Sequence, residues 1–208
     1  MAVFFGTLRN VVIAGFVLAL AVVAIYVGCL HGSLDATFWS FVTRWLHVIA
    51  GVMWIGLLYY FNFVQIPTMP KVPAELKGGV TGFIAPQALW WFRYGALATI
   101  VLGLVLAMQS PSYSLHDAFT LGLMGEPNMS ASILGIGMWL GLIMGFNVWF
   151  VIWPNQQKAL NIGGKFSDLA AEQKLAAGKT AMVFSRINTM LSIPMLYMMV
   201  AQQNGGLQ

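Results

Sequence analysis

Residues 44–56 read Arg-Trp-Leu-His-Val-Ile-Ala-Gly-Val-Met-Trp-Ile-Gly. Apart from Arg44 and His47, this stretch is apolar enough to lie in lipid, and it sits within a longer apolar run over about 38–66. A hydrocarbon core of about 30 Å is crossed by about 20 helical residues. The stretch therefore predicts a membrane-spanning helix that carries an arginine and a histidine.

The rest of the chain has the same character. Of its 208 residues, 59% are apolar and 8% are charged, whereas soluble proteins carry about 25% charged residues. Helices satisfy their own backbone hydrogen bonds in lipid. We therefore expect an all-α, polytopic integral membrane protein in a lipid bilayer, with residues 1–208 forming one domain. Its five transmembrane helices are predicted at about 10–30, 38–66, 86–108, 131–153 and 180–202.

The basic residues predict the orientation of these helices. The loops 31–37 and 109–130 contain no Lys or Arg, and nine of the ten basic residues lie toward the opposite side. Because basic residues are retained in the cytoplasm, we expect a bacterial inner-membrane protein with a cytoplasmic N-terminus and a periplasmic C-terminus. The net charge of +4 then reflects topology, and no nucleic-acid partner is predicted.

Two segments, 63–67 and 150–154, resemble each other at an offset of 87 residues. Each ends in proline and is followed by a lysine and then by a Gly-Gly pair. The match predicts two similar helical hairpins that form a four-helix unit, with the first helix added. Chance similarity between two membrane-exit sequences explains so short a match equally well. In both copies, proline is expected to mark the end of a helix.

The polar residues of the second predicted helix fall on one stripe. Spacings of three and four place these positions on one helical face, which should point toward protein, a cofactor or water rather than lipid. Counted from the outer end of the helix, His47 lies about 14 Å deep. The stripe comprises Arg44, His47, Gly51, Trp54, Leu58, Asn62 and Gln65.

His47 has two interpretations. It is either an axial ligand of haem b, with space at Gly51 for the macrocycle and Trp54 stacking nearby, or a neutral side chain hydrogen-bonded to another helix, for example to Asn147 or Asn188. No second histidine lies at the same depth, which leaves a methionine, a vacant position or another subunit for the sixth ligand. Arg44, one turn nearer the surface, would meet a haem propionate, a lipid phosphate or an acidic residue of a partner.

Two further patterns predict helix packing. Gly137, Gly141 and Gly145 form a repeated small-xxx-small pattern that permits close helix approach. On the last helix, Ser and Asn residues recur on one face and predict interhelical hydrogen bonds. This second face comprises Ser185, Asn188, Ser192, Met195 and Met199.

Residues 44–56 and 147–158 together resemble the urate oxidase N-terminal family, the membrane domain of bacterial membrane-bound urate hydroxylase. Members of this family also carry a C-terminal cytochrome c domain, whereas these 208 residues contain one cysteine and therefore no Cys-x-x-Cys-His haem attachment. The resemblance implies a protein of membrane redox metabolism. We expect a non-catalytic accessory subunit that packs with other subunits in a respiratory or photosynthetic complex. The alternative is a redox module of the urate-hydroxylase type that binds haem b through His47, as metal ligand, and uses a separate cytochrome c.

Overall fold

The computed structural model describes residues 2–124 and 126–205, and it is all-α, with no strand among those residues. Five helical segments are long and apolar enough to cross a membrane, as expected for a polytopic membrane protein. Contacts group the chain into two compact units, Met1–Val42 and Thr43–Gln208. The five segments are Leu8–Gly28, Ala36–Lys71, Ala74–Met108, Met129–Ala159 and Ala171–Asn204.

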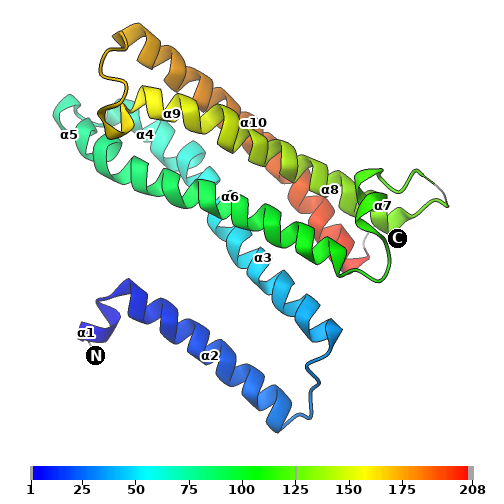
Figure 1. The fold of residues 1–208 in the computed structure, drawn as a ribbon. Coiled ribbons are helices and arrows are strands. Elements are labelled where there is room, and N and C mark those ends of the chain that lie inside the picture. Colours follow the sequence, from blue (N-terminus) through cyan, green and yellow to red (C-terminus); the bar gives the residue numbers. More distant parts are fainter. Residues whose placement is uncertain (1, 125, 206–208) are drawn as a thin grey trace. The chain divides into compact units, whose positions relative to one another are not determined.

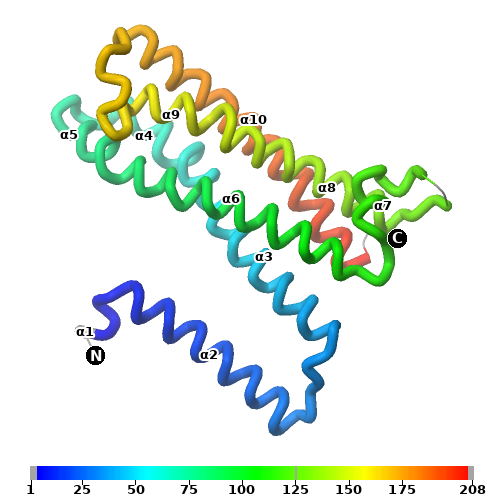
Figure 2. The backbone as a smooth tube through the Cα atoms, in the orientation of Figure 1, coloured from blue at the N-terminus to red at the C-terminus, as the bar shows by residue number. Residues whose placement is uncertain are grey.

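Residues 43–208 form a four-helix unit, which Figures 1 and 2 trace from cyan to red. Its main helices are α3 (Ala36–Tyr59), which begins in the first unit, α6 (Ala85–Met108), α8 (Met129–Phe146) and α10 (Ala171–Asn204). Helix α10 packs along α8 and α9 (Trp153–Ala159), and α6 packs against α8. The shorter elements of this unit are α4 (Ile66–Thr68), α5 (Ala74–Gly79), α7 (Leu115–Phe119) and two 3₁₀ turns, Met69–Lys71 and Ile162–Gly164.

Large apolar side chains from all four helices fill the centre of this unit. Trp54 and Leu58 come from α3, Phe92 from α6 and Met144 from α8, and each is at most 1% exposed. The rings of Phe61 and Phe92 meet edge to face, with 5.7 Å between their centroids. The remaining buried members of the core are Ile55, Leu89, Ala96, Val148, Ile152, Ala181 and Met195.

Prolines do not end these helices, and that prediction was wrong. A π-helical segment precedes each of Pro67, Pro86 and Pro154 by one residue, and the helix continues beyond the ring. Proline lacks an N–H and clashes with the carbonyl four residues earlier in an α-helix. The wider turn avoids this arrangement, because the residue before each proline donates to the carbonyl five residues earlier. These bonds join Ile66 to Phe61, Ala85 to Val80 and Trp153 to Val148.

The internal repeat is present locally as two of these π-helical segments. Tyr60–Gln65 and Asn147–Ile152 are separated by the same 87 residues as the sequence match. The Gly-Gly pairs do not correspond, however. Gly78 and Gly79 are helical in α5, whereas Gly163 and Gly164 have φ values of 71° and 72° in the connection before α10. The repeat therefore covers the proline-containing turns and not the connections that follow them.

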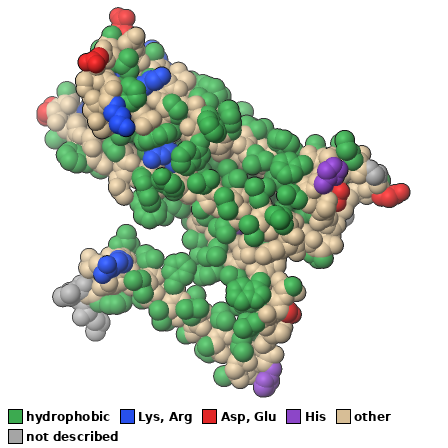
Figure 3. Space-filling model, viewed as in Figure 1, with side chains coloured by type: hydrophobic (Ala, Val, Ile, Leu, Met, Phe, Trp, Pro, Cys, Tyr) green, Lys and Arg blue, Asp and Glu red, His purple; other side chains and the backbone are tan. Residues whose placement is uncertain are grey.

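The four main helical segments are longer than the sequence predicted. Ala171–Asn204 contains 34 residues, which is about 51 Å of α-helix and exceeds a hydrocarbon core of about 30 Å. The extra turns lie at the end that carries α5, α9 and the start of α10, where Lys and Arg side chains gather in Figure 3. The helices therefore extend out of the apolar region on their basic side.

The loop between α6 and α8 is ordered by hydrogen bonds. Ser114 and Asp117 form a capping box at α7, with Ser114 N–H donating to Asp117 Oδ2 at 2.8 Å and Asp117 N–H donating to Ser114 Oγ at 3.1 Å. These bonds from Ser114, first through its backbone, lower the pKa of Asp117 below its ordinary range. Ser132 Oγ on α8 donates to Leu121 O at 2.7 Å and holds the loop against the helix.

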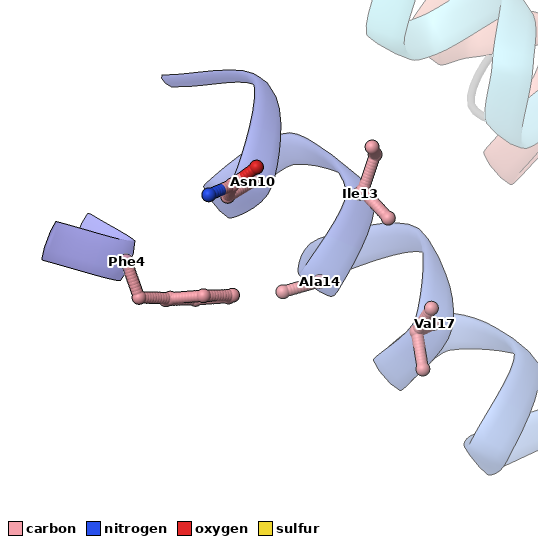
Figure 4. Close-up of a pocket in the computed structure, with 5 residues that line it drawn as sticks. All are labelled: Phe4, Asn10, Ile13, Ala14 and Val17. Carbon is pink, nitrogen blue, oxygen red and sulfur yellow. The ribbon is translucent and has the colours of Figure 1, made fainter. Parts of the chain in front are cut away.

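The first unit contains α1 (Ala2–Phe5) and α2 (Leu8–Gly28), and α2 has no buried residue. Figure 4 shows the ring of Phe4 turned toward Ala14, where both line a shallow, open depression beside α2. Asn10 is the polar side chain among the five that line it. An open and almost wholly apolar depression of this kind offers no group for chemistry.

Asp35 begins the helix that follows α2. Its Oδ1 accepts from Phe38 N–H at 3.0 Å, the N-cap arrangement, and its Oδ2 accepts from Ser33 Oγ at 2.9 Å. The bond from the Phe38 backbone, followed by that from Ser33, lowers the pKa of Asp35. The start of α3 is therefore fixed by an ionised carboxylate.

Candidate functional site

His47 is held by the neighbouring helix α6. Its Nδ1 lies 2.8 Å from the carbonyl oxygen of Thr99. A carbonyl only accepts, so Nδ1 carries the hydrogen. A Cβ added at Gly103 would lie 2.9 Å from His47 Cε1, so the absence of a side chain at Gly103 leaves room for the imidazole ring. In the neutral ring Nε2 is then unprotonated, and no described residue hydrogen-bonds to it.

The hydrogen bond expected from His47 to another helix is present, but the partners given as examples, Asn147 and Asn188, were wrong. Asn147 and Asn188 bond to each other instead, with Asn147 Nδ2 donating to Asn188 Oδ1 at 2.9 Å. Asn188 Nδ2 then donates to Met144 O, also at 2.9 Å. This chain of bonds is buried between α8 and α10, whereas the acceptor for His47 is a backbone carbonyl of α6. Side-chain patterns give no signal for such an acceptor.

Gly51 and Trp54 serve the packing of α3 on α6. A Cβ at Gly51 would meet Thr99 Cγ2 at 3.9 Å, and Trp54 is 1% exposed in the core. A Cβ at Gly95 of α6 would lie 3.3 Å from the Trp54 backbone nitrogen. The expectation that Gly51 leaves space for a macrocycle and that Trp54 stacks on it stays a prediction.

Arg44 lies one turn from His47 and is exposed. No ion pair to Arg44 occurs among the described residues, where the single ion pair joins His116 and Asp117. The structure therefore brings Arg44 and His47 to the same helical face without giving the guanidinium an acidic partner in this chain.

The interhelical bonds that the sequence predicted for α10 are made by Asn62, a residue of the stripe in the π-helical segment after α3, and by Tyr59, which lies off the stripe. Tyr59 Oη and Ser192 Oγ are 2.9 Å apart, and Asn62 Nδ2 donates to Ser185 Oγ at 2.8 Å. Ser185 and Ser192 are both buried. Thus the polar face of α10 is confirmed as a set of hydrogen bonds to α3, to α8 and to the π-helical segments that follow each of them.

The three glycines of α8 differ from one another. A Cβ at Gly137 would meet Met199 Cε at 3.0 Å and Met198 Cβ at 3.2 Å, and a Cβ at Gly145 would overlap the Ile100 side chain. At Gly141, in contrast, no atom of the four-helix unit lies within 4 Å of that position. Two glycines therefore make room for α10 and α6, while Gly141 has no neighbour in this bundle.

Sequence reasoning missed the environment of Arg93. It was assigned to the basic side of the membrane, yet in α6 it is only 7% exposed. Its guanidinium carbon lies 3.2 Å from the ring centroid of Trp153 and 6.0 Å from that of Trp149. In the sequence, Arg93 lies among the aromatic residues 90–94. This position does not indicate that Trp153, 60 residues later, covers the guanidinium.

Comparisons of the chain with protein-family models, with curated proteins and with solved structures found no match. The resemblance of residues 44–56 and 147–158 to the urate oxidase N-terminal family therefore stays a prediction. The class that the fold defines is a multi-pass, all-α membrane protein.

Proposed function

We propose that this protein is a non-catalytic accessory subunit that packs with other membrane proteins in a redox complex of a bacterial inner membrane. The observation that carries the proposal is the open glycine at position 141, which has no neighbour in the four-helix unit. Small residues at a helix surface allow another helix to approach closely. Lipid chains make no such demand, so a half-buried glycine with open space at its Cβ position, between two packed glycines, favours a partner helix.

A second open glycine supports the same function. Gly56 on α3 is exposed, and no atom of the four-helix unit lies within 4 Å of its Cβ position. It lines an apolar groove on this helix with Val52 and Met53. The redox setting of the complex rests on the family resemblance, and the cytoplasmic N-terminus rests on the charge asymmetry of the loops.

Gly141→Leu tests the accessory role. The protein is extracted from its native membrane in mild detergent, and its partners and assembly size are measured by co-purification and native electrophoresis. We expect the variant to lose its partners while its thermal unfolding stays within a few degrees of the parent, since the added side chain enters open space. Ile143→Leu, at an exposed large residue on the same helix, is the matched control. Unchanged assembly in Gly141→Leu would contradict the proposal.

His47 favours the second function, a redox module. Ligating histidines commonly donate their other ring N–H to a backbone carbonyl, and His47 does this while Nε2 has no partner among the described residues. The residues present thus fit one axial ligand of haem b. When bound, haem would supply one-electron transfer, for which a cytochrome c is the expected partner. The Thr99 carbonyl would fix the ring, and Arg44 would offer its charge to a propionate.

An optical spectrum of the intact protein from its native membrane tests this second function. Haem binding predicts a Soret band that shifts on reduction, is absent in His47→Ala and persists in His116→Ala, where the histidine is exposed on the outer loop. Colourless protein would reject the redox module and leave His47 as a polar contact between α3 and α6.

A further inference from the structure

Arg93 carries a buried charge with no counter-ion in the described chain. The side chain is 93% buried, and its Nε and Nη1 atoms have no hydrogen-bond partner among the described residues. Stacking on Trp153 stabilises the cation through the face of the indole. It does not satisfy the N–H groups, which lie in the plane of the guanidinium. A buried and unpaired charge of this kind is costly.

Trp149 provides a second unsatisfied donor beside Arg93. Its indole Nε1 is also buried without a hydrogen-bond partner, and the Arg93 guanidinium carbon lies 6.0 Å from its ring centroid. Guanidinium and indole nitrogens donate hydrogen bonds and do not accept them. The two side chains therefore cannot satisfy each other. Together they define a cluster that requires an acceptor oxygen, and a negative charge on that oxygen would also offset the cation.

The depth of this cluster identifies where the acceptor comes from. Arg93 is 15 residues from Met108, the outer end of α6, or about 22 Å along the helix. In a hydrocarbon core of about 30 Å, it lies roughly 8 Å from the basic side. Trp90, Trp91 and Tyr94 beside it are each more than 40% exposed, as is typical of aromatic residues at the level of lipid headgroups.

We propose that Arg93 and Trp149 bind the phosphate of an anionic phospholipid from the leaflet on the basic side of the protein. The guanidinium presents its N–H groups to the phosphate oxygens as a charged, planar donor, and the indole N–H supplies a further bond. Trp153 covers one face of the guanidinium. An anionic headgroup is preferred to a zwitterionic one because it leaves the site neutral and is also attracted by the lysines at this end of the bundle.

Lipid-dependent stability of the full chain tests this site. The protein is placed in nanodiscs of phosphatidylcholine with increasing phosphatidylglycerol, and its unfolding temperature and the number of lipids retained in native mass spectrometry are measured. We expect phosphatidylglycerol to raise the unfolding temperature of the parent by several degrees and one lipid to be retained. Arg93→Met should lose both effects. Arg186→Met, at an exposed arginine on α10, should keep them.

A second variant and a second ligand keep the outcomes distinct. If Arg93→Met does not fold, Arg93→Lys retains the charge but loses the planar guanidinium donors, and it should require at least tenfold more phosphatidylglycerol for the same effect. Inorganic phosphate in pure phosphatidylcholine should not reproduce the stabilisation; if it does, the site takes free phosphate and the lipid assignment is wrong. Equal responses of the parent and Arg93→Met to both ligands would overturn the site altogether.

Discussion

Asn188 on α10 is the buried residue whose replacement should have the clearest effect on stability. It is 0% exposed, accepts a hydrogen bond from Asn147 and donates one to the Met144 carbonyl. Asn188→Ala removes two bonds that are each worth about 0.6–1.7 kcal/mol between membrane helices. It also leaves the Asn147 amide unpaired. We therefore expect a loss of roughly 1–3 kcal/mol in the free energy of unfolding.

Reversible unfolding in mixed detergent micelles, followed by tryptophan fluorescence, measures this loss. Asn204→Ala is the matched control, because Asn204 is exposed on the same helix and its side chain donates to the Val200 carbonyl four residues earlier. A double-mutant cycle with Asn147→Ala isolates the contact between the two amides. Either single replacement leaves the other amide without its partner. The double variant should therefore lose about 1 kcal/mol less in the free energy of unfolding than the sum of the two single losses. Additive losses, or a loss in Asn188→Ala no larger than in Asn204→Ala, would refute this account of the buried network.

Three further outcomes are expected. The folded pKa of Asp35 lies below its ordinary value of 3.8. The ionised cap on α3 therefore contributes its full stability above pH 3.8, and this contribution is lost as the pH falls through the folded pKa. The protection of the Phe38 amide from hydrogen exchange should fall over this pH range in the parent and be low at every pH in Asp35→Asn. In a Cys29→Ser background, His116→Cys should be labelled from the periplasm and Lys165→Cys from the cytoplasm, and labelling of both from one side would reject the topology. Gly103→Leu should displace the His47 ring and destabilise the bundle by about 1–3 kcal/mol in the same unfolding assay, whereas Gly141→Leu should not.

The sequence was sufficient for the features that depend on hydrophobicity and helical period. Runs of apolar residues predicted the five helices, and spacings of three and four predicted the polar faces of α3 and α10. Periodicity identifies a face but not the helix opposite it. The Thr99 carbonyl that holds His47 is a backbone group, and the neighbours of Gly137 and Gly145 come from different helices. The partner of His47 and the role of each α8 glycine therefore required the arrangement in space.

For Arg93, one interpretation of the sequence concealed another. Basic residues gather on the cytoplasmic side of membrane proteins, and Arg93 agreed with that rule, so its charge was fully explained by topology. The rule concerns the end of a helix and contains no information about burial. The covering residues, Trp149 and Trp153, lie in and directly after a π-helical segment, which a pattern based on 3.6 residues per turn does not describe.

The π-helical segments connect these observations physically. A proline in an α-helix usually ends or kinks it, and a helix that ended at Pro154 would leave α9 and its aromatic residue without a fixed direction. The bond from Trp153 N–H to Val148 O carries the chain through this position instead. The helix then continues along α10 and places the Trp153 ring over Arg93. π-Turns within helices are frequently found at functional sites, and here the segment that repeats at 87 residues also contains Trp149. The π-helical segment that allows Pro154 to remain inside a long helix thus also brings Trp149 and Trp153 to Arg93, at the basic end of the bundle.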